Sequence, residues 1–292
     1  MGKTAVVTDS NSGITNAEAG EWGIYMLPMP FFIDGELYYE GVTLSPEEFY
    51  RHQAEGTDIA TSQPSPGAVL EMWDRALETN DELLYIPMSS ALSGSCATAR
   101  SLAGDYDGRV TVVDNQRISA TQRQSVFDAV ELLRLGYTAA ETAAILEEER
   151  LAASIYITVD TLKYLRRGGR ITAAAAALGT MLSIKPVLQI QGDKLDAFSM
   201  ANGMKAAKQI ILDAVEADLE TRFRGVEGVC VVAAYSCTDE EARGWADEIR
   251  ERFGSRFNEY IAPLALSIGC HTGPGAFGVG CVRMAALGRE RK

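Results

Sequence analysis

The first half of the chain alternates short β-branched runs with longer segments of helical periodicity, and this alternation most narrows the possible folds. Strands separated by helices of this length form βαβ units, because a crossover between parallel strands needs about a dozen or more residues. We therefore predict an α/β domain with a mostly parallel sheet flanked by helices. The predicted strands are Ala5–Thr8, Ile24–Leu27, Leu83–Pro87 and Val110–Asp114, and the predicted helices are Pro46–Ala54, Pro66–Thr79, Ser95–Ala103, Thr121–Leu135 and Ala139–Leu151.

A second set of elements begins at the strand-like run Ile155–Val159, after the charged helix Glu141–Arg150. At 292 residues the chain suits two domains, and we place them at residues 1–153 and 154–292. The second is expected to be a mixed α/β domain. Its predicted helices are Asp160–Arg167, Ala173–Met181 and Met204–Phe223, and its further predicted strands are Val229–Ala234, Tyr260–Ser267 and Gly278–Ala285.

The composition is globular and the chain is acidic. Hydrophobic residues make up 47% of it, and the formal net charge is −13. An acidic surface repels nucleic acids and anionic membranes, so we expect neither as a partner. The longest apolar stretch, Ile171–Ile184, is interrupted by polar residues and glycine and is shorter than the roughly 20 residues that span a bilayer. We therefore expect no stable membrane insertion.

Cysteine and histidine usage indicates a reducing compartment and excludes common metal sites. The five cysteines have no CxxC spacing, so neither a disulfide framework nor a zinc site is indicated. With only two histidines, His52 and His271, a histidine-rich metal site is excluded as well. The N-terminus leads directly into a strand-like segment without a run of signal-peptide length, so we expect a cytoplasmic protein.

Small hydroxyl residues gather at the predicted carboxyl ends of strands, which is where open parallel sheets form ligand sites. The first strand ends in Thr8-Asp9-Ser10. The strand Leu83–Pro87 leads into a serine-rich loop that ends at Ser95, and Thr61-Ser62 lies between the two strands in sequence. A polar site at this edge of the sheet is therefore expected.

Ser93 admits two interpretations. Because it precedes a predicted helix, the free N–H groups of Gly94 and Ser95 would point outward with the positive end of the helix dipole and suit an anion. A serine at this position more commonly caps the helix with its hydroxyl. Spacing alone favours the cap.

Thr61 and Ser62 have no obvious structural role. The cap of the helix that follows them is better assigned to Ser65, with Pro66 at the first helical position. This assignment leaves both hydroxyls free and slightly favours a binding role for them.

His271 stands in the glycine-rich segment Gly269–Gly278, which we expect to be a tight loop. A lone histidine is more often structural than functional, but this one is nearly the only histidine in the chain. Gly273–Gly278 also matches the letters GxGxxG. A dinucleotide fingerprint needs a helix after its glycines, whereas the β-like Val279–Val282 follows here, so we interpret the match as accidental.

The basic run Leu162–Ile171 is unusual in an acidic protein. Its positive charges could complement the carboxyl end of a helix closed by Gly168, or Arg167 and Arg170 could form a docking site for a phosphate-bearing partner. Spacing alone favours the helix end.

Taken together, the order and spacing of several segments resemble the DegV family of bacterial fatty-acid-binding proteins over essentially the whole chain. The resemblance is carried by Val7-Thr8-Asp9-Ser10, Thr61-Ser62-Gln63-Pro64-Ser65, Ser89-Ser90-Ala91-Leu92-Ser93-Gly94, Val113-Asp114, Leu162–Ile171, Ser183-Ile184-Lys185-Pro186-Val187 and His271-Thr272-Gly273-Pro274-Gly275-Ala276.

The resemblance implies two α/β domains with a lipid tunnel and the head group at the domain junction. It implies a long-chain fatty acid as ligand, such as palmitate, stearate or oleate, and no other cofactor. The carboxylate would be held by Thr61, Ser62 and Ser93 with Gly94, and His271 would lie nearby. It also implies a separate fatty acid kinase as partner, which phosphorylates the bound acid for phospholipid synthesis. The carrier itself is then not an enzyme.

Three segments depart from the family pattern. Arg117–Gln124 replaces a segment that is small and glycine-rich in many members, only Lys205 is basic within Met200–Lys205, and Gly94-Ser95-Cys96 replaces a usual Gly-Thr-aromatic sequence. The first two lead us to expect weak coupling to the kinase, or coupling to a divergent one.

Two other functions compete with the carrier. Ser93, His271 and Asp9 could form a hydrolase triad, although Leu92-Ser93-Gly94 lacks the GxSxG elbow of α/β hydrolases. A sensor for another small carboxylate or phosphate would use the same polar residues but would need a short polar cavity. The length of the cavity behind Ser93 separates the sensor from the carrier.

Overall fold

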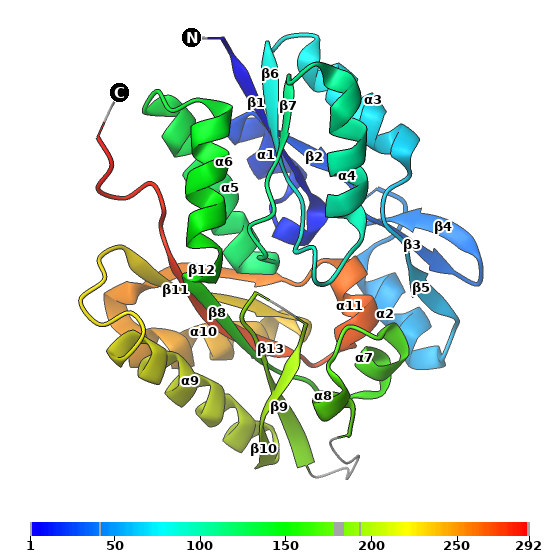
Figure 1. Ribbon diagram of the computed structural model, residues 1–292. Helices are drawn as coiled ribbons and strands as arrows, with labels where there is room; N and C mark the ends of the chain where they lie inside the picture. Colours follow the sequence, from blue (N-terminus) through cyan, green and yellow to red (C-terminus); the bar gives the residue numbers. More distant parts are fainter. Residues whose placement is uncertain (1, 41, 178–183, 193, 291–292) are drawn as a thin grey trace.

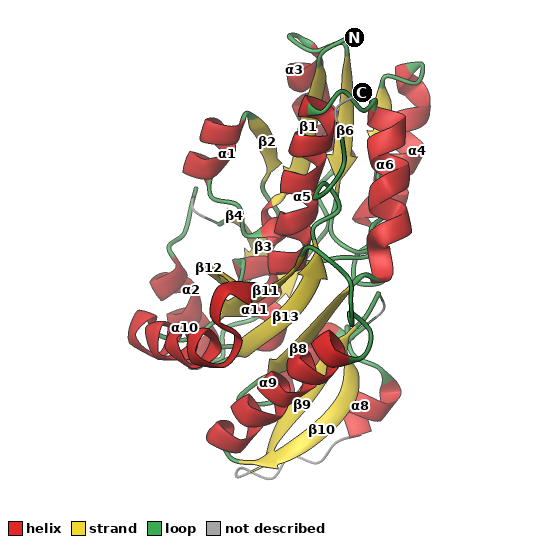
Figure 2. Ribbon diagram, turned by 90° about the vertical axis from the view of Figure 1, so that its left-hand side faces the viewer, coloured by secondary structure: helices red, strands yellow, loops and turns green. Residues whose placement is uncertain are grey.

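The computed structural model describes residues 2–40, 42–177, 184–192 and 194–290, and it contains two α/β domains stacked one above the other (Figures 1 and 2). Both chain termini lie at the outer end of the first domain (Figure 1). The predicted two-domain α/β fold is confirmed. The boundary between residues 153 and 154 stays a prediction.

The first domain contains a four-stranded parallel sheet in the order β2-β1-β6-β7. Successive residues of β1 point to opposite faces, so Val6 packs against α1, α5 and α6 while Val7 packs against α3 and α4. The strands are β1 (Thr4–Asp9), β2 (Ile24–Leu27), β6 (Glu82–Ile86) and β7 (Val110–Val112), and the helices are α1 (Asn16–Trp22), α3 (Pro66–Leu77), α4 (Ser95–Ala103), α5 (Ser119–Arg134) and α6 (Ala139–Glu148).

The second domain contains a six-stranded mixed sheet in the order β10-β9-β8-β13-β11-β12. One face packs against α9 and α10 around Trp245, and the other face is turned toward the first domain. The strands are β8 (Ala153–Thr158), β9 (Ile184–Ile190), β10 (Asp196–Asn202), β11 (Val229–Tyr235), β12 (Phe257–Pro263) and β13 (Phe277–Arg283), and the helices are α7 (Lys163–Gly168), α8 (Ala173–Ala177), α9 (Met204–Glu220), α10 (Asp239–Phe253) and α11 (Leu266–Thr272).

A small third sheet, which the sequence analysis missed, connects the first domain to α11. It has the order β4-β3-β5 and is accompanied by α2. Phe31 of β3 and Phe49 of α2 pack with Leu266 of α11, so this sheet rests on the second domain. Its elements are β3 (Pro30–Ile33), β4 (Glu36–Tyr39), α2 (Pro46–Glu55) and β5 (Ile59–Thr61).

Several predicted elements differ from the structure. The predicted strand Tyr260–Ser267 is wrong at its end, because β12 stops at Pro263 and α11 begins at Leu266. The helix predicted over Ala173–Met181 is present as α8 up to Ala177, and the rest of it lies outside the described residues. The helices α1 and α10 and the strands β9 and β10 were not predicted. Short 3-10 turns were not predicted either: η1 (Ser10–Ser12), η2 (Gly104–Tyr106), η3 (Glu149–Leu151) and η4 (Gly254–Arg256).

An apolar core continues from one domain into the other. Met88 and Ile118 of the first domain pack in the same cluster as Ile157, Leu188 and Leu264 of the second. Among the described residues, no helix is both long and apolar enough to cross a bilayer.

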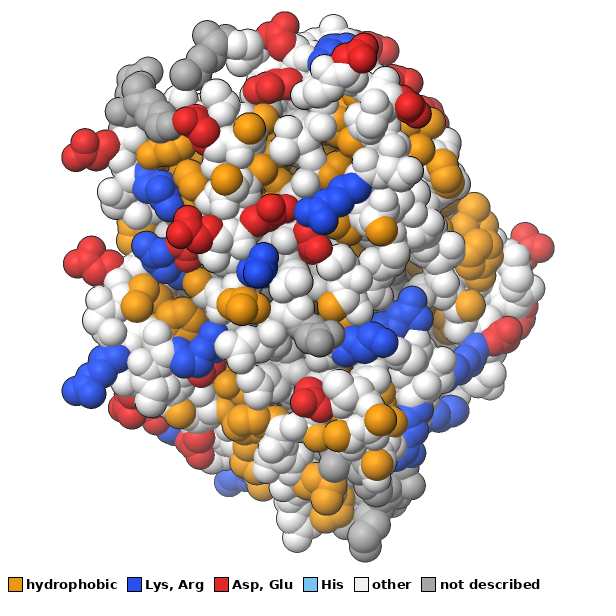
Figure 3. Space-filling model, in the orientation of Figure 1, with side chains coloured by type: hydrophobic (Ala, Val, Ile, Leu, Met, Phe, Trp, Pro, Cys, Tyr) orange, Lys and Arg blue, Asp and Glu red, His pale blue; other side chains and the backbone are white. Residues whose placement is uncertain are grey.

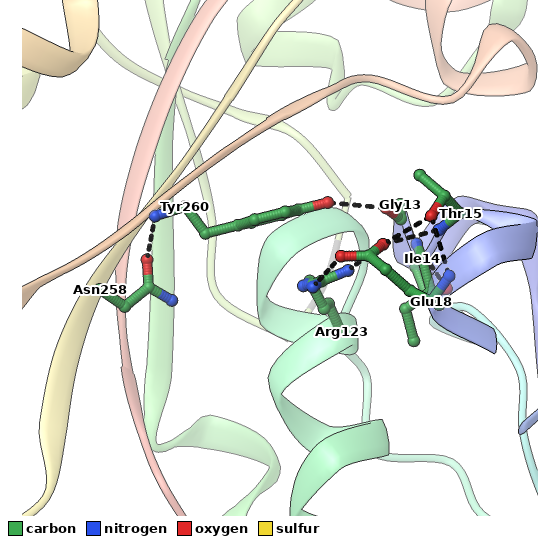
Figure 4. A network of polar contacts seen from close by, with 8 residues as sticks. Gly13, Ile14, Thr15, Glu18, Arg123, Asn258 and Tyr260 are labelled. Atoms are coloured by element: carbon green, nitrogen blue, oxygen red, sulfur yellow. Dashed lines mark hydrogen bonds and ion pairs between the residues drawn. The ribbon is translucent and has the colours of Figure 1, made fainter. Parts of the chain in front are cut away.

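A polar contact also joins the domains (Figure 4). Arg123 of α5 forms a bidentate ion pair with Glu18 of α1, and its guanidinium lies 3.7 Å from the ring centroid of Tyr260 in β12. The Tyr260 hydroxyl donates to the carbonyl of Gly13 at 2.9 Å. Arg123 lowers the pKa of Glu18 to about 2, which keeps this carboxylate charged.

Candidate functional site

Two adjoining cavities lie where the domains meet. One, the polar cavity, has Thr61, Ser93 and His271 in its wall. The other, the apolar cavity, is lined mostly by apolar residues, about half of them from the six-stranded sheet and the rest from segments of both domains, such as Ile118 and Leu264. They share the wall residues Leu92, Ile118, Leu195, Ile268 and Thr272. Their volumes are about 70 Å³ for the polar cavity and about 60 Å³ for the apolar one. Each cavity is therefore small, and the shared wall residues place the two next to each other.

Thr61 and His271 come from different domains and form a hydrogen bond across the polar cavity. Thr61 ends β5, and its Oγ1 lies 3.0 Å from Nε2 of His271. His271 does not lie in a loop, as the glycines around it suggested, but in the last turn of α11. The tight turn begins only at Gly273, where φ is +74°. The small sheet that rests on α11 thus brings these two residues together.

His271 is uncharged at neutral pH. Burial lowers the pKa of its imidazole to about 4, and the positive charge of Arg170 adds to this shift. Nδ1 is buried without a hydrogen-bond partner among the described residues. If Nε2 carries the proton and donates to Thr61 Oγ1, the Thr61 hydroxyl can donate its own proton to a ligand. A neutral histidine can therefore orient a hydroxyl donor.

The imidazole is held in place by close backbone contact with α7. A Cβ atom added to Gly168, the last residue of α7, would lie 2.0 Å from Nδ1 of His271. Only glycine leaves room for the ring at this position. Gly168 therefore has a packing function that the sequence analysis did not assign. The prediction that Gly168 closes the helix is wrong, because Gly168 is still helical and the left-handed residue that ends α7 is Gly169, with φ of +67°.

Ser93 is not the N-cap of α4, which spacing favoured, but lies one residue before it. Its Oγ accepts a hydrogen bond from the N–H of Ser95 at 3.2 Å, while the N-cap of α4 is Gly94, which has no capping side chain. An oxygen that accepts from the helix is oriented so that its proton can be donated elsewhere. Ser93 lines the polar cavity, and Gly94, although not in its wall, adjoins Ser93.

The loop that carries Thr61 is fixed to the loop that carries Ser93. Gln63 donates from Nε2 to Oγ1 of Thr98 in α4 at 3.0 Å, and a Cβ on Gly94 would lie 3.0 Å from Gln63 Oε1. Ser62 lies between these contacts, and its hydroxyl donates to the carbonyl of Gln63 at 3.0 Å. Ser62 lines the cavity but its proton is already engaged.

Arg170 and Arg167, which the sequence singled out together, lie in different surroundings. Arg170 is in the wall of the polar cavity and donates to the backbone carbonyls of Leu92 and Gly168, and no carboxylate among the described residues pairs with it. Arg167 pairs with Asp58 and donates to the carbonyl of Ile59. Figure 3 shows a group of basic side chains in the region of α7. The docking role of both arginines stays a prediction.

Asn11 and Ser267 belong to the polar cavity, and the sequence analysis missed them. Ser267 of α11 donates from Oγ to Oδ1 of Asn11 at 2.6 Å, and Asn11 follows the first strand. Asn11 directly follows Thr8-Asp9-Ser10, so its position at the carboxyl end of β1 was a usable signal. Ser267 fell in the segment that was wrongly predicted as a strand.

The hydrolase triad is not assembled. His271 bonds to Thr61, and Ser93 accepts from a backbone N–H. Asp9 is fully buried and accepts from the N–H groups of Met88 and Asn11 and from Gln122, and burial raises its pKa to about 6. No hydrogen bond of the described residues joins Ser93 or Asp9 to His271.

The GxGxxG letters also have the structural context expected of an accidental match. After Gly275 the chain enters the strand β13, so no helix N-terminus is available for a pyrophosphate. Within the described part of the chain, no group of three histidine, cysteine or acidic side chains is arranged to hold a metal ion.

Comparisons with known proteins agree on one family. A family model described as an uncharacterised protein of the DegV family matches residues 3–284. A DegV domain-containing protein from Deinococcus radiodurans is 33% identical over 283 residues, which cover 97% of this chain and 99% of that protein.

Two solved structures extend the similarity to the fold. A DegV family protein from Thermus thermophilus, described as fatty acid binding, superposes with a TM-score of 0.87 at 33% identity, covering 96% of this chain and 99% of the other. DegV from Bacillus subtilis, described as a fatty acid binding protein, gives a TM-score of 0.84 at 26% identity with coverage of 96% and 99%.

Proposed function

This chain belongs to the DegV family, and from this premise we propose that it binds one long-chain fatty acid, such as palmitate, stearate or oleate. The carboxylate would lie in the polar cavity between the domains and the acyl chain in the apolar cavity. Similarity to the fatty-acid-binding proteins of Thermus thermophilus and Bacillus subtilis supports this assignment.

The observation that carries the proposal is that the polar cavity adjoins an apolar one. Burial contributes about 0.8 kcal/mol per CH₂, so enclosing about sixteen carbons offers on the order of 12 kcal/mol before the costs of binding. A sensor for a short carboxylate has no use for the apolar part, which is lined by side chains such as Ile155, Ile157 and Val232. The continuation of the cavity therefore favours the carrier.

The polar cavity supplies what a buried carboxylate requires. An unpaired carboxylate in an apolar tunnel is costly, and donors or a nearby positive charge offset that cost. Ser93 offers its hydroxyl proton, since its oxygen accepts from the N–H of Ser95, and Thr61 offers its own in the tautomer in which Nε2 of His271 carries the proton. Arg170 offers the positive charge. Ser62 and Gly94 complete the proposed ligand set, because they directly follow Thr61 and Ser93 in the same loops.

We further propose that the protein presents the acid to a separate fatty acid kinase and is not itself the phosphotransferase. Arg167 and Arg170 would form part of the docking site, and five unpaired cysteines fit a role in the reducing cytoplasm. Coupling is expected to be weak, because basic residues of the departing segment are used inside the protein. Arg117 is 2% exposed, and Arg123 pairs with Glu18.

A test of coupling is reconstitution with a fatty acid kinase and ATP. Slow acyl-phosphate formation, compared with a carrier known to be served by that kinase, is the expected result. Acyl-phosphate formation at the full rate would refute weak coupling.

The test of binding is to extract the purified protein with organic solvent and identify the co-purified acid by mass spectrometry. Thr61→Val and Ser93→Ala should each retain less acid, because losing a hydrogen bond to a charged group costs about 1.5–3 kcal/mol, or roughly a 10- to 150-fold loss of affinity. Thr61→Ser keeps the hydroxyl and should retain the acid. Ser101→Ala, at an exposed position of α4, is the matched control. Undiminished occupancy in both site variants would contradict the carboxylate assignment.

A further inference from the structure

The central strand β13 carries two glycines on the face that borders the apolar cavity. Phe277, Val279 and Cys281 pack into the core formed with α9 and α10. Because side chains of a strand alternate between faces, Gly278 and Gly280 point to the opposite face, and both line the cavity.

The neighbouring strands make these two positions into a trough. In the sheet register, Gly278 lies between Ile157 of β8 and Ala234 of β11. Gly280 lies in the same way between Ile155 and Val232. Since both glycines lack a side chain, the surface of β13 is left open at these positions, while side chains of β8 and β11 stand on either side of it.

The trough is closed two residues further along the strand. Val282 is the next residue on this face, and it packs with Ala153, Cys230 and Ala120 of α5. Same-face residues of a strand are about 7 Å apart, so Gly278 and Gly280 open a path of that order before the wall at Val282. The apolar cavity that contains this path shares the wall residues Ile118 and Ile268 with the polar cavity.

The two glycines differ in what the backbone requires of them. A Cβ on Gly280 would lie 2.3 Å from the carbonyl oxygen of Ser154, so the close approach of β8 demands glycine there. A Cβ on Gly278 would have ordinary contacts, 3.5 Å to the Ala234 oxygen and 3.8 Å to Cγ1 of Ile157, and its φ is not positive. Glycine inside a strand weakens the strand. Neither a backbone clash nor a positive φ explains the glycine at position 278, so we attribute it to the space that it leaves in the cavity.

We propose that Gly278 is a specificity-determining residue that admits the distal part of a long acyl chain across β13. The proposal rests on the proposed function, because it assumes that the apolar cavity holds the acyl chain. Because Gly278 has no side chain, the trough stays open between the shared wall of the two cavities and the closed end at Val282. The ligand class that this geometry selects is the long straight-chain acid, rather than a short one that ends before the trough.

The test is the variant Gly278→Val, which fills the trough with a residue that suits a central strand. Binding of hexadecanoic and decanoic acids is measured by isothermal titration calorimetry on delipidated full-length protein. Losing the burial of about two CH₂ groups should weaken hexadecanoic acid about tenfold, while decanoic acid should change less than about twofold. Gly278→Ala should give a smaller loss in the same direction.

Further measurements distinguish an effect on acyl-chain length from a folding defect and from a failure of the proposed function. Gly244→Ala, in the exposed part of α10 with no atom near the new Cβ, should bind both acids as the unmodified protein does. An unchanged or higher melting temperature of Gly278→Ala shows that the sheet tolerates the change. Equal effects of Gly278→Val on both acids, or no effect on either, would overturn the inference. If the unmodified protein bound neither acid, the proposed function itself would be wrong.

Discussion

At the scale of single residues, the polar cavity depends on how hydroxyl and imidazole protons are directed. Thr61 and Ser93 each have a neighbouring nitrogen that can donate to the hydroxyl oxygen. A hydroxyl whose lone pair is engaged in this way presents its proton in a fixed direction. The neutral state of His271 thus matters as much as its position.

The low pKa of His271 predicts a measurable pH dependence of stability. In the unfolded chain the imidazole takes up a proton near its ordinary pKa of 6.5, but in the folded protein it does so only near pH 4. The unfolded state therefore binds more protons in this window, and the free energy of unfolding falls as the pH drops from 6.5 to 4, by at most about 3 kcal/mol.

Urea denaturation of the unmodified protein and of His271→Gln between pH 4 and pH 8 measures this contribution. Glutamine does not titrate, so the stability difference between the two proteins should change with pH in the stated direction. A difference that is constant across the range would show that the pKa of His271 is the same in the folded and unfolded protein, and would contradict the lowered pKa.

The sequence singles out Thr61 and His271 separately but does not predict that they bond. They are 210 positions apart, and their contact depends on the small sheet that sequence patterning missed. The contact of Ser267 with Asn11 was missed because it joins the two domains, which no local pattern records, although the position of Asn11 after the first strand was a usable signal. The hydroxyls at the ends of β1 and β6 were recognisable, since strand ends can be read from periodicity.

At the scale of elements, the packing of α7 against α11 positions the imidazole. Gly168→Ala would place a methyl group where the His271 ring lies, so the ring must move away from Thr61. We expect a loss of about 1–3 kcal/mol in the free energy of unfolding, together with weaker retention of the acid.

The matched control for Gly168→Ala is Gly67→Ala in α3, where no atom lies near the new Cβ. Alanine at that helical position should stabilise the protein by up to about 1 kcal/mol and leave acid retention unchanged. Thermal unfolding and quantification of the extracted acid give both readouts. Normal acid retention in Gly168→Ala would show that the ring contact does not position His271.

Elements with strong periodicity were predicted well, and short or ambiguous ones were not. The strands β3 and β4 are only four residues long, yet Asp34-Gly35 between them, with φ of +50° and +85°, is a recognisable hairpin signal that was overlooked. The apolar run before α11 is equally compatible with a strand or a helix, and its true boundary is fixed by packing against Phe31 and Phe49.

At the scale of the whole molecule, the contact of Arg123 with Tyr260 should couple the two domains. We expect a double-mutant cycle of Arg123→Met and Tyr260→Leu to give a coupling of about 1 kcal/mol in the free energy of unfolding, since a cation near an aromatic face at a largely buried site is worth that much. Urea denaturation measures the four proteins of the cycle.

Arg134→Met is the matched control for that cycle. Arg134 lies on the same helix and above Trp22 of its own domain, so its combination with Tyr260→Leu should be additive. Additivity of Arg123→Met with Tyr260→Leu would show instead that the stacked pair contributes nothing across the junction.

The fold class follows from the alternation of strands and helices, but the arrangement of the domains does not. The mixed sheet and the cavity on the face that it turns toward the first domain depend on pairings such as β8 with β13, which join segments far apart in the chain. Local patterns do not encode such pairings. For the sequence analysis, the tunnel was an implication of family resemblance rather than of hydrophobic periodicity.

The apolar core that runs from one domain into the other has a consequence for handling cargo. An acyl chain bound at this junction would also hold the domains together, because its carbons would contact both of them. Binding of the acid would then reduce the relative motion of the two domains, and release of the acid would increase it. Hydrogen exchange of the amides at the domain junction would therefore report whether the acid is bound. A partner protein would then distinguish the loaded from the empty form by the motion of its surface, without contacting the lipid.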